Sequence, residues 1–277
     1  MVRPLRIDRD QVVRRARLIL AALAVFASGC VTTSAHHWGE DATATPGFAR
    51  IRSAAADAVR DPHVWVPLAG AALFQIGGWD RKVSNWARDN TPVFGSQRGA
   101  QDWSDRLRTA SSVAYFTTVV LTPGPEDVES WLRDKAKGVT VGLGAIATAG
   151  LATSALKGAT GRTRPNGEGT NSFPSGHTSH SAVLTGLARD DLEYEDLSPF
   201  TRTALDAGLD LLTAGTAWAR IEAGAHFPSD TLASIGLGNF VSRVFDRSFL
   251  DPEGEHRLAW GLAPTPGGAQ LTWEVRF

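Results

Sequence analysis

The chain has 277 residues, of which 43% are hydrophobic, and its 28 basic and 29 acidic side chains give a formal net charge of −1. This length is enough for one large domain with a real hydrophobic core. The near-neutral charge argues against a strongly basic nucleic-acid binder. The single cysteine, Cys30, excludes an internal disulfide framework and a metal cluster held by several cysteines.

The first 29 residues form a basic leader. Six arginines against two aspartates give residues 1–29 a charge of +4, so the rest of the chain carries −5. The basic stretch leads into the apolar segment 18–26 and then into small residues, which is the pattern of a secretory signal. This apolar segment is shorter than the roughly 20 residues that a membrane-spanning helix needs. We therefore predict a signal peptide over residues 1–29.

Residues 27–30 read Ala-Ser-Gly-Cys and resemble a bacterial lipobox, although Ala27 stands where leucine is usual. The resemblance implies a lipid anchor at Cys30. Because Val31 rather than an aspartate follows, it also implies retention on the periplasmic side of the outer membrane. An ordinary cleaved signal or an uncleaved anchor is the alternative. The small residues of 30–47 predict a flexible lipidated tether.

A helical pattern follows over residues 48–250, with breaks at proline and glycine clusters. The expected helices lie at 48–60, 63–77, 80–90, 99–121, 126–157, 176–190, 199–218 and 228–247. One start is explicit, since Ser198 before Pro199 predicts an N-cap and a first-turn proline. The predicted fold class is mainly α, a helical bundle.

Three of the helical stretches carry no charge, 64–79, 109–125 and 138–156. The last has 19 residues, which raises the question of a membrane span. Its many small residues suit a helix packed closely on all sides, although small residues also line contacts between membrane helices. The mean hydropathy of −0.12 and two aspartates within helix 199–218 favour a globular domain.

The pattern changes to a period of two near the end of the chain. Leu258, Trp260 and Leu262 alternate with other residues before a proline- and glycine-rich turn, and a second alternating segment follows it. This pattern predicts a β-hairpin within residues 251–277. Its apolar face is expected to pack on the helices, because a lone hairpin is marginal in water. A membrane-contacting edge rich in aromatic residues is the alternative.

Three short islands in the second half of the chain contain the residue types that phosphate chemistry needs. Lys157, Arg164 and Arg220 can neutralise phosphate oxygens, and arginine does so with a planar fork of donors. Ser175 and Gly176 stand where a loop enters the next helix, and free N–H groups at a helix N-terminus form an anion site. Together these residues predict a site for a phosphate group.

Two histidines and a carboxylate accompany these cations. His226 and Asp230 are four residues apart, hence on one face of a helix whose first turn begins at His226. A carboxylate at that spacing can hold the imidazole in one tautomer and leave the other nitrogen free to attack. His177 can protonate the departing oxygen as a general acid. Arg162 indicates a surface or substrate-side charge, and Glu222 has no role that the chemistry requires.

The islands resemble the three motifs of the type 2 phosphatidic acid phosphatase family, which shares its site architecture with the vanadium haloperoxidases. These motifs are a lysine separated by six residues from Arg-Pro, a Pro-Ser-Gly-His, and Ser-Arg followed by a histidine and an aspartate. They match here as Lys157 with Arg164-Pro165, Pro174 to His177, and Arg220 with His226 and Asp230. Ala219 replaces the usual serine of the third motif, which is not one of the family's central catalytic residues.

The resemblance implies a phosphatase that needs no metal or other cofactor and works through a phosphohistidine. His226 would be the nucleophile, oriented by Asp230, and His177 would protonate the leaving group and then help to activate water. The phosphoryl oxygens would be bound by Lys157, Arg164, Ser175, Gly176 and Arg220.

The expected substrate is a phosphomonoester or diphosphate, lipid-linked and met at the envelope membrane, and no nucleic acid partner is expected. The alternatives are an acid phosphatase acting on small soluble phosphates, a vanadate-dependent haloperoxidase and a non-catalytic binding protein. Only eight residues, 166–173, separate the first two motifs, whereas haloperoxidases typically carry large insertions. Intact His177, His226 and Asp230 argue against pure binding, which needs no nucleophile.

Overall fold

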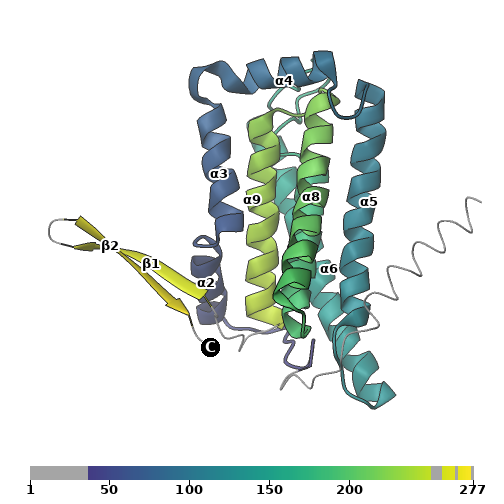
Figure 1. Ribbon diagram of the computed structural model, residues 1–277, viewed down its shortest axis with the longest axis vertical. Coiled ribbons are helices and arrows are strands. Elements are labelled where there is room, and N and C mark those ends of the chain that lie inside the picture. Colours follow the sequence, from purple (N-terminus) through teal and green to yellow (C-terminus); the bar gives the residue numbers. More distant parts are fainter. Residues whose placement is uncertain (1–36, 251–257, 266–267, 276–277) are drawn as a thin grey trace, which may run out of the picture.

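The computed structural model describes residues 37–250 together with the backbone of 258–265 and 268–275 (Figure 1). The predicted signal peptide, the lipidation site at Cys30 and the first part of the predicted tether lie outside the described residues. These features therefore stay predictions.

Long helices that run along one axis form a bundle, and a shorter helix lies across one of its ends (Figure 1). The helices are α2 (Phe48–Ala58), α3 (Pro62–Phe74), α4 (Trp79–Asn90), α5 (Gln97–Leu121), α6 (Val128–Thr160), α7 (Gly176–Asp191), α8 (Pro199–Glu222) and α9 (Pro228–Phe245). Short helical turns cover Ile76–Gly78, Leu192–Tyr194 and Asp246–Leu250. The predicted mainly α class is confirmed, and each expected helix is present.

Local sequence signals set the helix boundaries. Ser96, Asp127 and Ser198 each accept a hydrogen bond from the backbone N–H three residues on, which satisfies an otherwise free donor at a helix start. Pro199 occupies the first turn of α8, as predicted. α6 ends at Gly161, whose φ of 54° is left-handed and turns the chain back toward α7.

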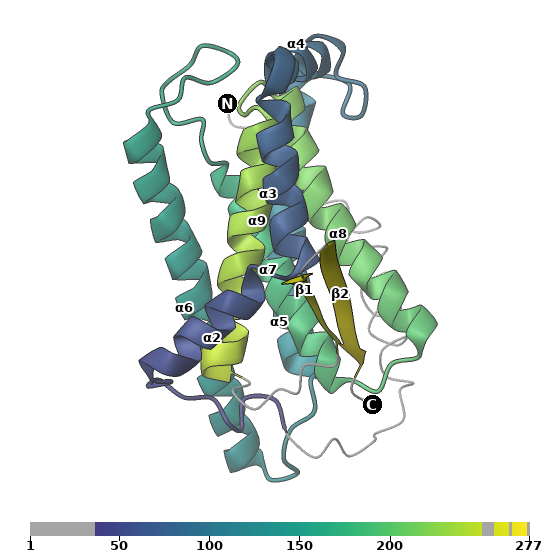
Figure 2. The same ribbon diagram turned by 90° about the vertical axis from the view of Figure 1, so that its left-hand side faces the viewer.

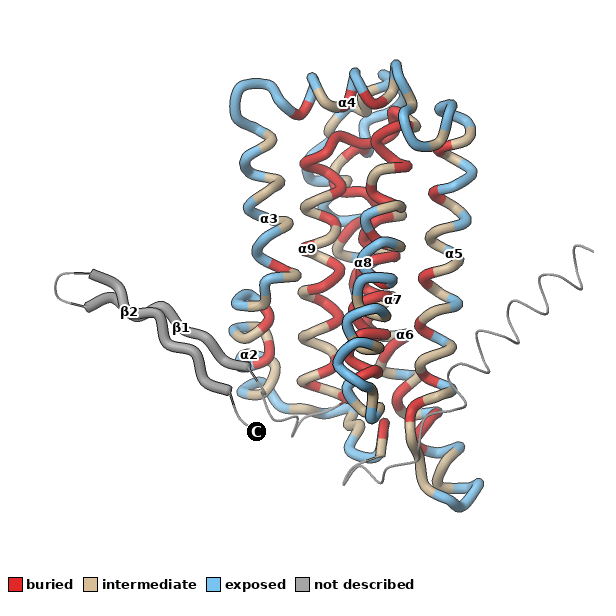
Figure 3. The backbone as a smooth tube through the Cα atoms, in the orientation of Figure 1, coloured by how far each residue is buried: buried red, intermediate tan, exposed pale blue. Residues whose placement is uncertain are grey.

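α7 and α9 form the centre of the bundle, and both are lined with buried residues (Figure 3). Their close approach needs a glycine, because a Cβ added at Gly238 would come within 2.5 Å of the Cβ of Ala182. Figure 2 shows α6 and α8 on opposite sides of this central pair. The core therefore extends along the whole length of α7, and α7 runs from one end of the bundle to the other.

α6 packs against the bundle on one side only. Ala145 and Ala149 face the core, whereas Leu151 is 73% exposed and Leu143 is also exposed. The prediction that 138–156 is enclosed on all sides is therefore wrong for its outer face. Within the described part of the chain, α6 is the one helix long and apolar enough to cross a membrane, and 22% of its most apolar window is buried.

The segment before α2 packs into the core around Trp38, which is 0% exposed. The indole N–H of Trp38 donates to Asp191 Oδ1 at 2.7 Å. Gly138 of α6 lies so close to the ring that an added Cβ would overlap it. The expectation of a flexible tether up to residue 47 is therefore wrong around Trp38, because burying an indole contributes about 2–3 kcal/mol and holds the segment in place.

The last described segments are β1 (Leu258–Thr265) and β2 (Gly268–Val275). Their backbones pair antiparallel, with Trp260 opposite Trp273. The side chains of both segments lie outside the described residues. The predicted packing of an apolar hairpin face on the helices therefore stays a prediction.

Candidate active site

The three sequence islands meet at the end of the bundle that α4 crosses (Figure 1). Lys157 is in the last turn of α6, Gly176 begins α7, Arg220 is in the last turn of α8, and His226 stands just before α9. Each island therefore lies at a helix end, and the alternating directions of these helices bring the islands together. α4 and the start of α5 complete this end of the molecule.

Two arginines at this end, the buried Arg220 and the partly buried Arg164, have buried donors without acceptors among the described residues. Arg220 Nη1 donates to the side chains of Gln101 and Ser104 on α5. The Nε groups of Arg220 and Arg164 find no acceptor among the described residues. Burial, and then the charge of Arg164, lower the pKa of Arg220 to about 10. Each unpaired buried donor costs about 1–3 kcal/mol, so an anion bound between these arginines would relieve both the missing contacts and the repulsion.

Lys157 adds a third cation to the same place. Its ammonium group donates to the carbonyl of Asn171 in the loop between α6 and α7. Burial, and then the charge of Arg164, lower the pKa of Lys157 to about 8. Lys157, Arg164 and Arg220 therefore lie close enough together for the charge of Arg164 to add to burial in lowering the pKa of both Lys157 and Arg220.

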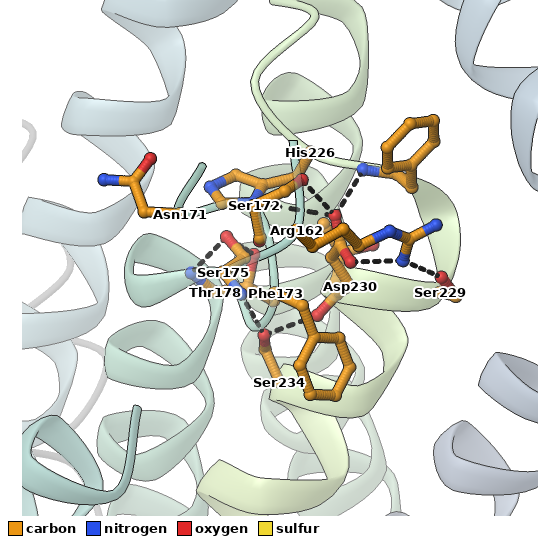
Figure 4. Close-up of polar contacts among 12 residues, drawn as sticks. Arg162, Asn171, Ser172, Phe173, Ser175, Thr178, His226, Ser229, Asp230 and Ser234 are labelled. Carbon is orange, nitrogen blue, oxygen red and sulfur yellow. Dashed lines mark hydrogen bonds and ion pairs between the residues drawn. The ribbon is translucent and has the colours of Figure 1, made fainter. Parts of the chain in front are cut away.

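The start of α7 uses Ser175 as its N-cap (Figure 4). The hydroxyl of Ser175 accepts a hydrogen bond from the hydroxyl of Thr178 at 3.0 Å, and the backbone N–H of Ser175 donates to Ser234 Oγ at 2.7 Å. The predicted contact of this hydroxyl with phosphate thus competes with the cap. The N–H groups of Gly176 and His177 lie at the helix N-terminus, where a helix offers its own free donors.

His226 is held by a main-chain carbonyl. The helix α9 begins at Pro228, so His226 precedes it, and the expected shared helical face of His226 and Asp230 is wrong. His226 Nδ1 lies 2.5 Å from the carbonyl oxygen of Ser172 and 3.9 Å from Asp230 Oδ2. A carbonyl only accepts, so we assign the proton to Nδ1, and Nε2 keeps its lone pair.

Asp230 acts on His226 through Ser172 (Figure 4). Its Oδ2 accepts from the Ser172 hydroxyl at 2.5 Å and from the Phe227 N–H at 2.8 Å. The carboxylate therefore fixes the residue whose carbonyl holds the imidazole. Burial, and then the charges of Arg220 and Lys157, hold the pKa of His226 well below its usual value, so the ring is neutral near pH 7.

Arg162 is a structural partner of Asp230. Its Nη1 donates to Asp230 Oδ1 at 2.6 Å and to Ser229 Oγ at 2.8 Å, and its Nη2 donates to Asp80 Oδ2 of α4 at 2.6 Å. The interpretation of Arg162 as a surface or substrate-side charge is therefore wrong. This network ties α4 to the start of α9 and keeps Asp230 in place.

His177 meets a carboxylate that the sequence motifs do not contain. Its Nε2 lies 2.7 Å from Asp105 Oδ1 of α5. Burial, and then the charge of Arg220, lower the pKa of His177. Gln101, Ser104 and Asp105 lie on one face of α5 by their spacing of three and four residues. That polar stripe was the available signal, but it becomes informative only when α5 is known to face α7 and α8.

Glu222 also has a role that sequence reasoning missed. This buried carboxylate accepts from the backbone N–H groups of Val93 and Phe94 at 2.9 and 3.0 Å, and from the indole N–H of Trp218 at 2.6 Å. It therefore fixes the loop between α4 and α5, and with it the position of α5 beside the site.

A helical bundle with three buried or partly buried cations near the helix ends, a neutral buried histidine and a second histidine beside a carboxylate has the features that a phosphate or a similar oxyanion needs. Residues 138–250, which contain all three motifs, match the PAP2 superfamily. The family resemblance drawn from the motifs is thereby confirmed. α4 and α5, which supply Asp80 and Asp105, lie outside the matched residues.

Two known proteins are similar to this chain. A lipid A 1-phosphatase of Porphyromonas gingivalis is 34% identical over 113 residues, which are 39% of this chain and 24% of that protein. A crystal structure of a transmembrane PAP2 type phosphatidylglycerolphosphate phosphatase from Bacillus subtilis matches with a TM-score of 0.47 and 17% identity, over 72% of this chain and 95% of that one. The chain thus aligns with 24% of the length of this lipid A 1-phosphatase.

Proposed function

We propose that the chain is a phosphatase that hydrolyses a lipid-linked phosphomonoester or diphosphate through a phosphohistidine, without a metal. The observation that carries this proposal is the pair of buried Nε donors on Arg164 and Arg220 that have no acceptor among the described residues. Besides burial, the charges of Arg164 and Arg220 lower the pKa of Lys157, which lies near them, and the N-terminus of α7 lies at the same end of the bundle. Phosphoryl transfer needs charge neutralisation and in-line positioning above all, and this arrangement offers both.

In the first step, the lone pair of His226 Nε2 attacks phosphorus, while Nδ1–H stays on the carbonyl of Ser172. The bond between phosphorus and the leaving oxygen breaks, and that oxygen takes a proton from His177. In the second step, water attacks the phosphorus of the phosphohistidine and gives a proton to His177. Phosphate leaves and His226 returns to its neutral form, so protons and charge balance over the cycle.

A lipid-linked substrate is supported by the surface around the site. Trp79 and Trp86 of α4 are 58% and 52% exposed, and Trp103 of α5 is also exposed. Lys82 and Arg106 lie over the rings of Trp79 and Trp103, each 5.3 Å from the centroid. Exposed indoles interleaved with cations are typical of surfaces that meet lipid headgroups. The name of the curated relative, a lipid A 1-phosphatase, agrees with a lipid substrate.

The place of the enzyme in the cell is proposed from the leader alone. The basic segment, the apolar segment and Cys30 support export and lipid anchoring at the periplasmic side of the envelope, at the outer membrane. Labelling with radioactive palmitate tests the anchor. We expect label on the wild type and none on Cys30→Ser, and label that survives this substitution would contradict the anchor.

The test of activity uses the full chain in detergent micelles with a chelator present. Phosphate release is measured from a lipid phosphate, an isoprenoid diphosphate and a soluble chromogenic ester. We expect the lipid substrates to react fastest, no effect of the chelator, and inhibition by vanadate. Loss of activity on chelation would contradict the metal-free mechanism, and a preference for the soluble ester would favour the acid phosphatase. Bromide oxidation with vanadate and peroxide would favour the haloperoxidase.

The nucleophile is tested by His226→Ala. We expect phosphate release to fall about 10⁴-fold or more, as when other enzymes lose a nucleophile. Acid-labile phosphoprotein should be trapped on the wild type from a radiolabelled substrate and should be absent from the variant. The control is His63→Ala. His63 lies in the first turn of α3, at the end of the bundle far from the site, and this variant should keep wild-type turnover. Wild-type turnover in His226→Ala would exclude the proposed nucleophile.

A further inference from the structure

Asp105 contacts a site histidine although it lies outside the three motifs and outside the residues that match the superfamily. It stands in the third turn of α5, which begins at Gln97. Its Oδ1 lies 2.7 Å from Nε2 of His177, and 72 residues separate the two in the chain. The first half of the molecule therefore reaches into the site at the residue expected to act as the general acid.

This contact decides which nitrogen of His177 can serve the substrate. An ionised carboxylate only accepts hydrogen bonds, so Nε2 carries the proton that faces Asp105. While that contact is made, Nδ1 is the nitrogen through which the ring can give or take a proton. A histidine held in this way has a defined tautomer, as general acid–base catalysis requires.

The charges around His177 give Asp105 a second effect. Burial, and then Arg220 of α8 and Arg108 of α5, lower the pKa of His177, whereas the hydrogen bond to Asp105 and its charge act in the opposite direction. A general acid must be protonated when the substrate arrives. Asp105 is thus the charged neighbour that favours the form needed for this step.

The carboxylate of Asp105 is itself held in place. The side chain of Gln101, one turn earlier on α5, forms a hydrogen bond with Asp105 and also accepts from Arg220 Nη1. Arg108 Nη2 lies 3.9 Å from Asp105 Oδ1. The same face of α5 therefore supports both the phosphate-binding arginine and the second histidine.

We propose that Asp105 is the positioning residue of the general acid: it holds His177 through Nε2 and favours the protonated ring, so that Nδ1 delivers a proton to the leaving oxygen. In this step the bond between phosphorus and the leaving oxygen breaks, its electron pair stays on that oxygen, and the proton moves there from Nδ1. The ring is left neutral, with its remaining proton on Nε2 facing Asp105. This inference rests on the proposed phosphatase function.

Comparing two substrates with different leaving groups distinguishes this role from a purely structural one. An alkoxide is a poor leaving group and needs the proton, whereas p-nitrophenolate leaves without it. In Asp105→Asn we expect kcat/KM for an alkyl phosphate to fall about 10²-fold, the low end for losing acid catalysis. For p-nitrophenyl phosphate we expect less than about a 3-fold change. The alkaline limb of the pH profile with the alkyl ester should move to lower pH.

Two further variants complete the test. Asp102→Asn removes an exposed carboxylate one turn away on the same helix, and we expect wild-type rates with both esters. Asp105→Glu keeps the charge on a longer side chain, and we expect it to restore part of the alkyl phosphatase activity. No recovery in Asp105→Glu, or an equal loss with both esters in Asp105→Asn, would overturn the proposal.

Failure of this inference is distinguishable from failure of the proposed function. His177→Asn is measured beside Asp105→Asn with the same two esters. If His177→Asn loses activity selectively with the alkyl ester and Asp105→Asn does not, Asp105 has no positioning role and the phosphatase mechanism stands. If the wild type releases no phosphate from either ester or from a lipid phosphate, the proposed function itself is wrong.

Discussion

The two ends of the bundle both bury charged side chains, but they pair them differently. At the end far from the candidate site, Arg243 Nε donates to Asp61 at 2.7 Å, and its Nη1 donates to Asp190. At the site end, the hydrogen bonds described for Arg220 go to an amide and a hydroxyl, and its Nε has no acceptor among the described residues. A cation paired with carboxylates joins helices, whereas a cation without one favours an anion from outside.

The far end shows buried charged groups whose partners lie within the protein. Lys135 donates to the carbonyl of Thr122, and the carboxylate of Asp191 accepts from Trp38 and from Thr118 at 2.7 and 2.6 Å. Burial raises the pKa of Asp191 to about 7 and lowers that of Lys135 to about 8. Shifted pKa values therefore occur at both ends. What distinguishes the candidate site is that no ion pair with a carboxylate is found among the described residues for Lys157, Arg164 or Arg220, whereas Arg189 and Arg243 at the far end are each paired.

The largest effect on stability is expected from Arg243→Met at the far end. The substitution leaves Asp61 and Asp190 buried without their cation, which destabilises the fold by about 3–5 kcal/mol. For a domain of this size Tm should fall by about 10 °C in calorimetry, while kcat/KM at low temperature should not change. Arg133→Met, which breaks an exposed pair with Glu129 at 2.8 Å, is the control and should leave Tm nearly unchanged. An unchanged Tm in Arg243→Met would remove the contrast between the ends.

Arg220→Met at the site end should show the reverse pattern. We expect kcat/KM to fall about 10²–10³-fold, as on losing one donor to the transition state. Tm should change little, because the substitution leaves no carboxylate without its partner. Vanadate should raise the Tm of the wild type by binding the folded state, and this rise should be lost in the variant. A fall in Tm as large as that of Arg243→Met would show that both ends are built for stability.

The smallest predicted effect is a displacement of the pH profile. His226 must be neutral, and burial followed by Arg220 lowers its pKa well below 6.5, so activity is lost only as pH falls through that low value. His177 must be protonated, and burial followed by Arg220 lowers its pKa below 6.5, so activity is lost as pH rises through it. We therefore expect kcat/KM to peak below pH 6.5, and both limbs to move to higher pH in Arg220→Met. A wild-type optimum above pH 6.5 would contradict this assignment.

Much of the fold could be predicted because helix boundaries depend on neighbouring residues. Ser198 and Pro199 mark the start of α8 in the structure as they do in the sequence. The three islands were also predicted to form one site, since each carries residue types that phosphate needs. Pro228, however, begins α9 two residues after His226, so the four-residue spacing to Asp230 did not describe a helical face.

The residues that were missed depend on contacts between distant parts of the chain. Asp80 meets Arg162 across 82 residues, and Trp38 meets Asp191 across 153. Asp105 meets His177 only because α5 packs against α7. No local period or motif carries this information, because it arises from how the helices pack rather than from how each one forms.

The hydrogen bond between His226 and the carbonyl of Ser172 has a consequence for mutagenesis. The residue contributes its carbonyl to the imidazole and its hydroxyl to Asp230. Every amino acid has that carbonyl, so an alanine scan would remove only the hydroxyl and would report Ser172 as a residue of modest importance. The orientation of His226, the proposed nucleophile, thus depends on the path of the main chain, which side-chain replacement does not change.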